Sequence, residues 1–132
     1  MRFFFDNNLS IRIAKAIAEL EDREKNTVVH IREKYDQAMA DVEWISRLGS
    51  EGGWIVLSCD RNIMRNPHER KAWEESGLTI FFIKENFKNL PFWDQSWQLI
   101  KRWPSIKEQA AKNPKSAQFV LSLTGTKIEK IS

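Results

Sequence analysis

The chain is poor in cysteine: Cys59 is the only one among 132 residues, so no internal disulfide can form. Cys59 lies in an apolar segment, where a buried thiol is expected rather than a nucleophile. Long hydrophobic runs are also missing. No stretch approaches the roughly 20 residues of a membrane span, and Phe3–Phe5 is shorter than a signal-peptide core of about 7 to 15 residues. We therefore expect a cytoplasmic protein.

A large excess of one charge is missing too. Twenty-one Lys and Arg against 18 Asp and Glu give a net charge of +3, which is compatible with a polyanion such as RNA but common in proteins that bind none. Hydrophobic residues make up 42% and charged residues 30%, a balance that excludes wholesale disorder. The length suits one domain, and we predict a single domain over residues 1–132.

Two apolar runs end in a carboxylate. Phe3–Phe5 leads into Asp6, and Trp54–Leu57 leads through two further residues to Asp60. A run that is apolar on both faces is typical of a buried strand in a parallel sheet, because helices cover both sides of such a sheet. Each acid then follows a strand, at the edge where ligands and catalytic groups collect in α/β sheets. The two runs therefore predict a shared polar site.

The rest of the chain alternates between helix and strand patterns. Helices are expected over about 11–22, 41–48, 67–76 and 91–111, and further strands over about 27–31 and 78–83. Pro104 should kink or split the last helix. Segments 118–123 and 127–131 suit one further strand or a terminal hairpin. Strands separated by helices predict an α/β fold with a doubly wound, mainly parallel sheet.

A third acid, Asp41, lies in the first turn of a predicted helix and faces the same edge as Asp6 and Asp60. Mg²⁺ prefers a few carboxylate oxygens and leaves positions for substrate phosphate oxygens, so such a cluster suits phosphodiester hydrolysis. Ser58 could donate a hydrogen bond that orients a carboxylate. Glu43 competes with Asp41, although two residues apart on a helix they cannot both face the site. Each acid alone could instead be a helix cap or a turn residue.

Several other residues have two open interpretations. Arg61 and Arg65 could pair with substrate phosphates or simply be solvated. His30, at the end of the second strand, suits a structural hydrogen bond or a general base. The aromatic segment Phe92–Trp103 could stack bases, but its helical spacing is more typical of core packing or of an interface with a second copy or another protein.

Three stretches together resemble PIN-like domains, and most closely the compact group that includes VapC-type toxins and Mut7-C-type nuclease domains. They are Phe3–Ser10, Asp41–Ile45 and Trp54–Ile63, with Arg65–Pro67 and Glu69–Arg70 in support. The resemblance covers residues 1–83 and leaves a C-terminal helical and strand extension over 84–132. It implies a PIN-like three-layer α/β/α sandwich around a sheet of four or five strands.

The resemblance also implies an activity: Mg²⁺- or Mn²⁺-dependent endoribonuclease cleavage, commonly as the toxin of a type II toxin-antitoxin pair with a small antitoxin as partner. A homodimer is a further expectation, because the aromatic segment Phe92–Trp103 suits an interface with a second copy. The resemblance assigns metal-binding and catalytic roles to Asp6, Asp41 and Asp60, and supporting roles to Asn8 and Ser58. The family pattern has a fourth acid shortly after the third. Here Arg61–Ile63 stand in those places, which favours one tightly held metal, with a second recruited by substrate.

Two alternatives stay open. A catalytically degenerate PIN-like module would bind RNA or protein without cutting, in keeping with the missing fourth acid. A receiver-like phosphoacceptor domain also has acids after its first and third strands, but it needs an acidic pair where this chain has Asp6–Asn8 and a lysine with no clear counterpart here. For a nuclease, the three carboxylates should lie roughly 4 to 6 Å apart, within common reach of one cation.

Overall fold

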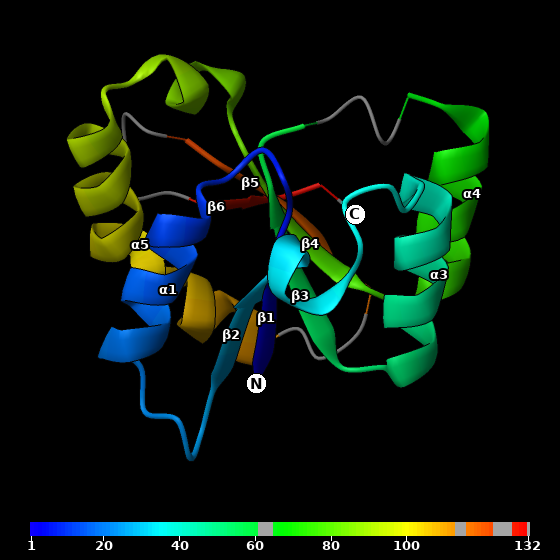
Figure 1. Cartoon of the computed structure of the whole chain (residues 1–132), viewed down its shortest axis with the longest axis horizontal. Helices are drawn as coiled ribbons and strands as arrows, with labels where there is room; N and C mark the ends of the chain where they lie inside the picture. Colours follow the sequence, from blue (N-terminus) through cyan, green and yellow to red (C-terminus); the bar gives the residue numbers. More distant parts are fainter. Residues whose placement is uncertain (61–64, 113–115, 123–127, 132) are drawn as a thin grey trace.

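A six-stranded sheet in the order β2-β1-β3-β4-β5-β6 forms the centre of the computed structural model, which describes residues 1–60, 65–112, 116–122 and 128–131 (Figure 1). The strands are β1 (Arg2–Phe5), β2 (Thr27–His30), β3 (Trp54–Ser58), β4 (Thr79–Ile83), β5 (Gln118–Leu121) and β6 (Ile128–Lys130). The helices are α1 (Ile11–Leu20), α2 (Ile31–Lys34), α3 (Asp41–Glu51), α4 (Pro67–Ser76), the 3-10 helix η2 (Glu85–Asn89) and α5 (Phe92–Lys112). Strands β1 to β5 are parallel and β6 is antiparallel to β5.

The predicted α/β class with a mainly parallel sheet is confirmed, but the expected number of four or five strands was too low. Both halves of the C-terminal hairpin enter the sheet, because β6 pairs antiparallel with β5 through Leu121 and Ile128. The expected turn of that hairpin, 124–126, lies outside the described residues. No helix in the described ranges combines the length and apolarity that crossing a membrane requires.

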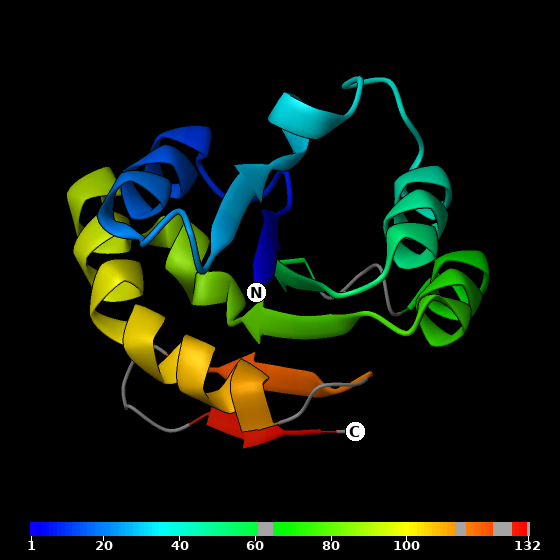
Figure 2. The same cartoon turned by 90° about the horizontal axis from the view of Figure 1, so that it is seen from below.

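Helices cover both faces of the sheet, which explains why the strands are apolar on both sides. Alternate residues of a strand point to opposite faces. Phe3 and Phe5 pack in the cluster that contains the buried residues of α1 and α5, whereas Phe4 packs in the cluster of α3 and α4. The two views show α1 and α5 on one side of the sheet and α3 and α4 on the other (Figures 1 and 2). The arrangement is a three-layer α/β/α sandwich.

Two elements differ from the prediction. The strand expected over about 27–31 ends at His30, and residues 31–34, for which no helix was predicted, form the short helix α2, because His30 and Glu33 make a reciprocal capping box. Helix α5 continues through Pro104 instead of splitting there. Trp103 and Ile106, on either side of the proline, are both buried against the sheet, and this packing outweighs the one backbone hydrogen bond that proline cannot donate.

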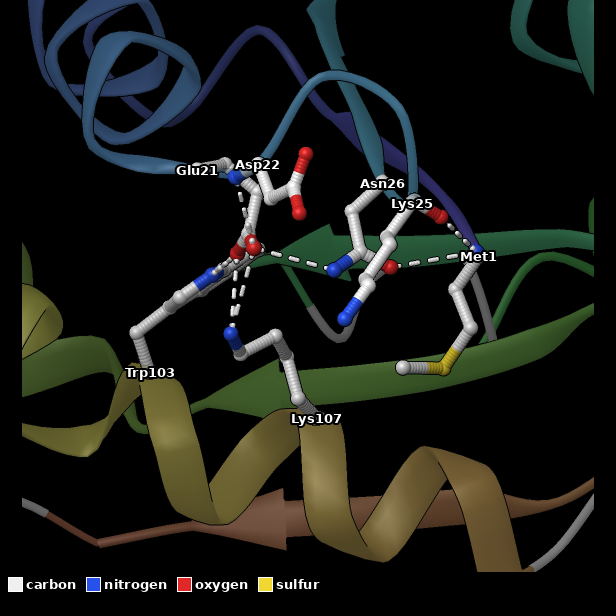
Figure 3. Close-up of polar contacts among 7 residues, drawn as sticks. All are labelled: Met1, Glu21, Asp22, Lys25, Asn26, Trp103 and Lys107. Carbon is white, nitrogen blue, oxygen red and sulfur yellow. Dashed lines mark hydrogen bonds and ion pairs between the residues drawn. The ribbon is translucent and has the colours of Figure 1, made fainter.

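A buried carboxylate fastens α5 to the end of α1 (Figure 3). Glu21 accepts hydrogen bonds from Trp103 Nε1 at 2.7 Å, Asn26 Nδ2 at 2.9 Å and Lys107 Nζ at 3.2 Å. Burial alone would raise the pKa of Glu21, but these donors outweigh it and lower the pKa from 4.5 to about 2. The Trp103 ring also lies 4.7 Å from that of Phe3. The C-terminal helix is therefore held to the first helix and the first strand.

Candidate active site

The predicted acids lie where neighbouring strands end. β1 and β3 are adjacent and parallel, with Phe5 opposite Leu57, and the Asp6 backbone N–H extends this pairing by donating to the Leu57 carbonyl at 3.0 Å. Asp6 therefore follows β1 beside the end of β3, which leads to Asp60. Asp41 is the first residue of α3, which runs back from this edge toward the start of β3 (Figure 1).

Ser58 connects two of these acids. Its side-chain Oγ donates to Asp6 Oδ2 at 2.9 Å and accepts from the Asp60 backbone N–H at 3.0 Å. The residue is fully buried, so water does not compete for these bonds. The sequence predicted that this hydroxyl would orient a carboxylate, and the structure has that hydrogen bond. The Ser-x-Asp spacing therefore sets the direction of the Asp6 side chain and the backbone path into Asp60.

Asp6 has an unusual electrostatic environment. It is only 4% exposed, and burial raises its pKa from 3.8 to about 6. Hydrogen bonds from the Asn7 backbone N–H at 2.6 Å and from Ser58 oppose this rise, whereas the negative charges of Asp41 and Asp60 add to it. The three predicted acids thus act on one another electrostatically, with Asp6 the most buried of them.

A fourth acid, Glu69, joins this group from the first turn of α4. Asn66 caps the helix by accepting from the backbone N–H groups of His68 and Glu69 at 3.0 and 3.3 Å. Burial raises the pKa of Glu69, and the charge of Asp41, a side-chain hydrogen bond with Asp41 and the charges of the other acids raise it further. The positions directly after Asp60 hold no acid, as the sequence shows, but the fold brings an acid from another element next to Asp41.

Glu69 was not predicted as a site residue, because the family pattern has its fourth acid shortly after the third, which is Asp60 here. Glu69 lies nine positions further on, and folding brings it back because α4 starts at the same edge of the sheet as α3. Its place in the first turn of the helix that follows β3 could have indicated that Glu69 lies at the same edge of the sheet as the other acids. Glu69 was also within the stretch that supported the family resemblance.

The structure also decides between Asp41 and Glu43. Asp41 Oδ1 accepts a hydrogen bond from Trp44 Nε1 at 2.9 Å, and its carboxylate interacts with Glu69 and Asp6. Glu43 instead pairs with Arg47 at 2.8 Å on the exposed surface of α3, where both side chains are more than half exposed. The acid of α3 that belongs to the cluster is therefore Asp41.

A family model described as a PIN like domain matches residues 1–85, which include all four acids. The chain belongs to the PIN-like domain family. PIN-like domains are typically nucleases and PIN domains generally use divalent metals. The strand order 2-1-3-4-5 also occurs in receiver-type doubly wound folds, so the family match, not the topology, favours the PIN-like over the receiver-like alternative. Neither a curated protein nor a solved structure matches the chain.

Beside the acids, this PIN-like domain has a small pocket of about 80 Å³. Asp6 and Asp41 line it together with Arg32 of α2 and Tyr35, the residue after α2. The remaining lining residues are Asn7, Ile31, Asp36, Gln37, Met39 and Trp44. Arg32 is thus a cation next to the acids that the sequence analysis did not select.

The other residues that the sequence suggested for the site differ in their burial and contacts. Asn8 and Arg65 are exposed, and Arg61 lies outside the described residues. His30 is buried, its Nε2 is 2.7 Å from the Leu9 carbonyl oxygen, and its Nδ1 accepts from the Arg32 backbone N–H. The structural interpretation of His30 is therefore confirmed, and burial lowers its pKa.

The predicted buried thiol is also confirmed. Cys59 is fully buried, and burial raises its pKa to about 12, so a thiolate does not form near neutral pH. Cys59 follows Ser58 and therefore points to the opposite face of the sheet, where it packs in the cluster of α1 and α5. The nearby charges of Asp6 and Asp60 add to the rise that burial causes in the pKa of Cys59.

The acids fit a divalent metal by their chemistry rather than by a preassembled geometry. Across the described ranges, no three His, Cys, Asp or Glu side chains are arranged to hold an ion, so the expectation that Asp6, Asp41 and Asp60 lie within common reach of one cation was wrong for this structure. Instead, Asp6 is held by Asn7 and Ser58, and Asp41 by Trp44. Four mutually repelling carboxylates at a partly buried edge are nevertheless the ligand type that hard cations prefer. Burial raises the pKa values of Asp6 and Glu69 most and repulsion between the acids adds to the rise, and a bound cation would offset both effects.

Proposed function

We propose that this PIN-like domain is a metal-dependent endoribonuclease that hydrolyses RNA phosphodiester bonds. The observation that carries the proposal is the electrostatic coupling of the buried Asp6 with Asp41, Asp60 and Glu69, which four separate elements bring to one edge. We assign the binding of Mg²⁺ or Mn²⁺ to these acids. Such an ion, when bound, activates a water and stabilises the leaving oxygen.

The chain's own residues would orient the reaction. Ser58 orients the Asp6 carboxylate and sets the backbone path into Asp60, so one of the acids is already oriented before substrate binds. Arg32 borders the pocket beside Asp6 and Asp41, where its guanidinium suits a substrate phosphate. We assign the same kind of contact to Arg61 and Arg65, which follow Asp60 in the sequence.

We further propose that the nuclease is the toxin of a type II toxin-antitoxin pair, in the cytoplasm, with a small antitoxin as its partner. The small size and the likeness to VapC-type toxins support this role. Induced expression in a bacterial host should arrest growth, whereas Asp6→Asn should not. Co-expression of a small DNA-binding protein encoded beside the nuclease gene should restore growth. Normal growth during expression of an active nuclease would contradict the toxin role but not the chemistry.

One observation favours a second candidate, a PIN-like module that binds RNA without cutting it. The described side chains include no three that are already arranged to hold an ion. The two candidates differ in one result: binding of RNA that stays intact with Mn²⁺ present would support the degenerate module.

The deciding experiment is cleavage of a labelled single-stranded RNA with Mg²⁺ or Mn²⁺. We expect Asp6→Asn and Asp41→Asn to reduce the rate by at least about a hundredfold, because each removes a charged ligand at the reacting centre. Glu43→Gln is the matched control: it removes an acid two residues from Asp41 that faces solvent, and it should leave the rate unchanged. Cleavage that continues undiminished in excess EDTA would overturn the mechanism.

A further inference from the structure

Helix α5 exposes two tryptophans near its start. Trp93 is 80% exposed and Trp97 is 49% exposed, whereas Trp103 in the same helix is only 6% exposed. Core packing, one of the interpretations that the spacing allowed, therefore holds for Trp103 and fails for the other two. Residues four apart lie on one face of a helix, about 6 Å apart along its axis at about 1.5 Å per residue. We call Trp93 and Trp97 the tryptophan face.

Neighbouring side chains hold the rings of the tryptophan face in place. Trp97 Nε1 donates to Asp94 Oδ1 at 3.1 Å, and Lys101 Nζ lies 5.7 Å from the centre of the Trp97 ring. The ring centre of Trp93 lies 6.2 Å from that of Phe92, edge to face. Phe92 is covered in turn by the Arg12 guanidinium at 4.0 Å. The Trp97 ring, which the hydrogen bond to Asp94 orients, loses less freedom when a flat partner stacks on it than an unrestrained ring would.

The tryptophan face starts at the same end of the sheet as the acids. Ser58 pairs with Phe82, so the chain leaves β4 at Lys84 next to the place where β3 leads to Asp60. From there η2 leads directly into α5, whose first turn lies beside the first turn of α1 (Figures 1 and 2). An RNA strand bound at the acids would reach the tryptophan face by crossing this edge of the sheet.

Cations line that route. Lys84 and Lys88 are exposed in the segment that leads from β4 to α5, Arg12 lies on Phe92, and Lys101 lies beside Trp97. Aromatic faces flanked by cations are the combination with which proteins bind single-stranded nucleic acid, because bases stack on the rings while phosphates pair with the cations. A duplex does not fit this chemistry, since its bases are already stacked and paired.

We propose that the tryptophan face binds the single-stranded RNA substrate outside the cleavage site, with one unpaired base stacked on Trp93 and another on Trp97. The inference rests on the proposed function, since it takes RNA as the substrate of the acids. It extends that function by naming a second contact surface for the RNA strand, on a helix that follows the residues matched by the family model. The face sets the affinity for RNA, and the acids carry out the chemistry.

The test measures binding without cleavage. The full chain in EDTA is titrated into a fluorescein-labelled 12-nucleotide single-stranded RNA, and anisotropy gives the dissociation constant. The double substitution Trp93→Ala with Trp97→Ala should weaken binding about tenfold or more, because base stacking on one aromatic ring alone typically accounts for a factor of that size. The double substitution to Phe should keep most of the affinity. The double substitution to Leu, which keeps an apolar surface without a ring, should lose it.

Leu20→Ala serves as the matched control, because Leu20 is 70% exposed at the other end of α1 and should not affect binding. Leu variants that bind like the wild type, or Ala variants that do, would overturn the proposal. Ala variants that change the association state in sedimentation while RNA affinity stays constant would also overturn it, in favour of a protein interface. If the protein binds RNA through the tryptophan face but never cleaves it, the proposed nuclease activity is wrong and the proposed RNA-binding face is not.

Discussion

Glu21 gives the sharpest quantitative prediction, because its carboxylate joins the C-terminal helix to the rest of the domain. The difference between a pKa of 4.5 and one of about 2 corresponds to about 3 kcal/mol, since a tenfold change in an equilibrium constant equals about 1.4 kcal/mol. The Glu21 side chain is 6% exposed but that of Lys107 is 30% exposed, so solvent screens part of this interaction. We expect Glu21→Gln to lower the free energy of unfolding by about 2 kcal/mol at pH 7.

The pH dependence follows from the direction of the shift. The folded state holds Glu21 ionised to lower pH than the unfolded state does, so its contribution is fully present above pH 4.5 and is lost as the pH falls toward about 2. Urea unfolding followed by tryptophan fluorescence should therefore show wild type and Glu21→Gln converging between about pH 4.5 and 2.5. Taking the difference between the two proteins cancels the titration of the other acids.

The control for this prediction is Glu19→Gln. Glu19 also pairs with a cation, Arg23, but both side chains are more than 70% exposed. Exposed pairs contribute little, so this substitution should change the free energy of unfolding by less than about 0.5 kcal/mol at any pH. A difference between wild type and Glu21→Gln that stays constant from pH 7 to 3 would refute the electrostatic reasoning.

Three further predictions concern other parts of the domain. Ser58→Ala removes the hydroxyl that orients Asp6, so it should slow RNA cleavage. It should also lower the free energy of unfolding, measured in urea titrations, by about 1 to 3 kcal/mol. An unchanged cleavage rate would contradict the orienting role. Gly49→Ala places a Cβ 2.8 Å from that of Ser76, so it should lower the free energy of unfolding by about 1 to 3 kcal/mol by disturbing the α3–α4 contact. RNA cleavage should persist in the folded fraction. An unchanged free energy of unfolding would show that the two helices can move apart without cost. Cys59 should resist alkylation by iodoacetamide at pH 8 in the folded protein and react in 6 M urea, as mass spectrometry would show; rapid modification of the native chain would contradict its burial.

Most of the fold could be predicted from local pattern. The runs Phe3–Phe5 and Trp54–Leu57 are apolar at every position, which is typical of a strand covered on both faces, so the parallel sheet and its helical layers could be predicted. The sequence pattern that predicts the C-terminal hairpin is weaker than that of the other strands. Its second strand, β6, lies mostly at the exposed edge of the sheet, where few apolar residues are needed and the pattern is correspondingly faint.

The candidate site was predicted only as far as single elements allow. Asp6, Ser58 and Asp60 belong to strand ends, so their shared edge followed from the strand pattern, and the hydrogen bond between Ser58 and Asp6 is in the structure. Glu69 and Arg32 were missed because each lies on a helix whose position depends on the path of the whole chain.

The sequence by itself determined the α/β class, the edge of the sheet on which acids gather and the family resemblance, because each depends on residue types in short segments. Only the tertiary structure decided which acids interact, that α5 continues through Pro104, and that Trp103 is buried while Trp93 and Trp97 are exposed. These features depend on contacts between residues far apart in the chain, such as Glu21 with Trp103, which no local pattern encodes.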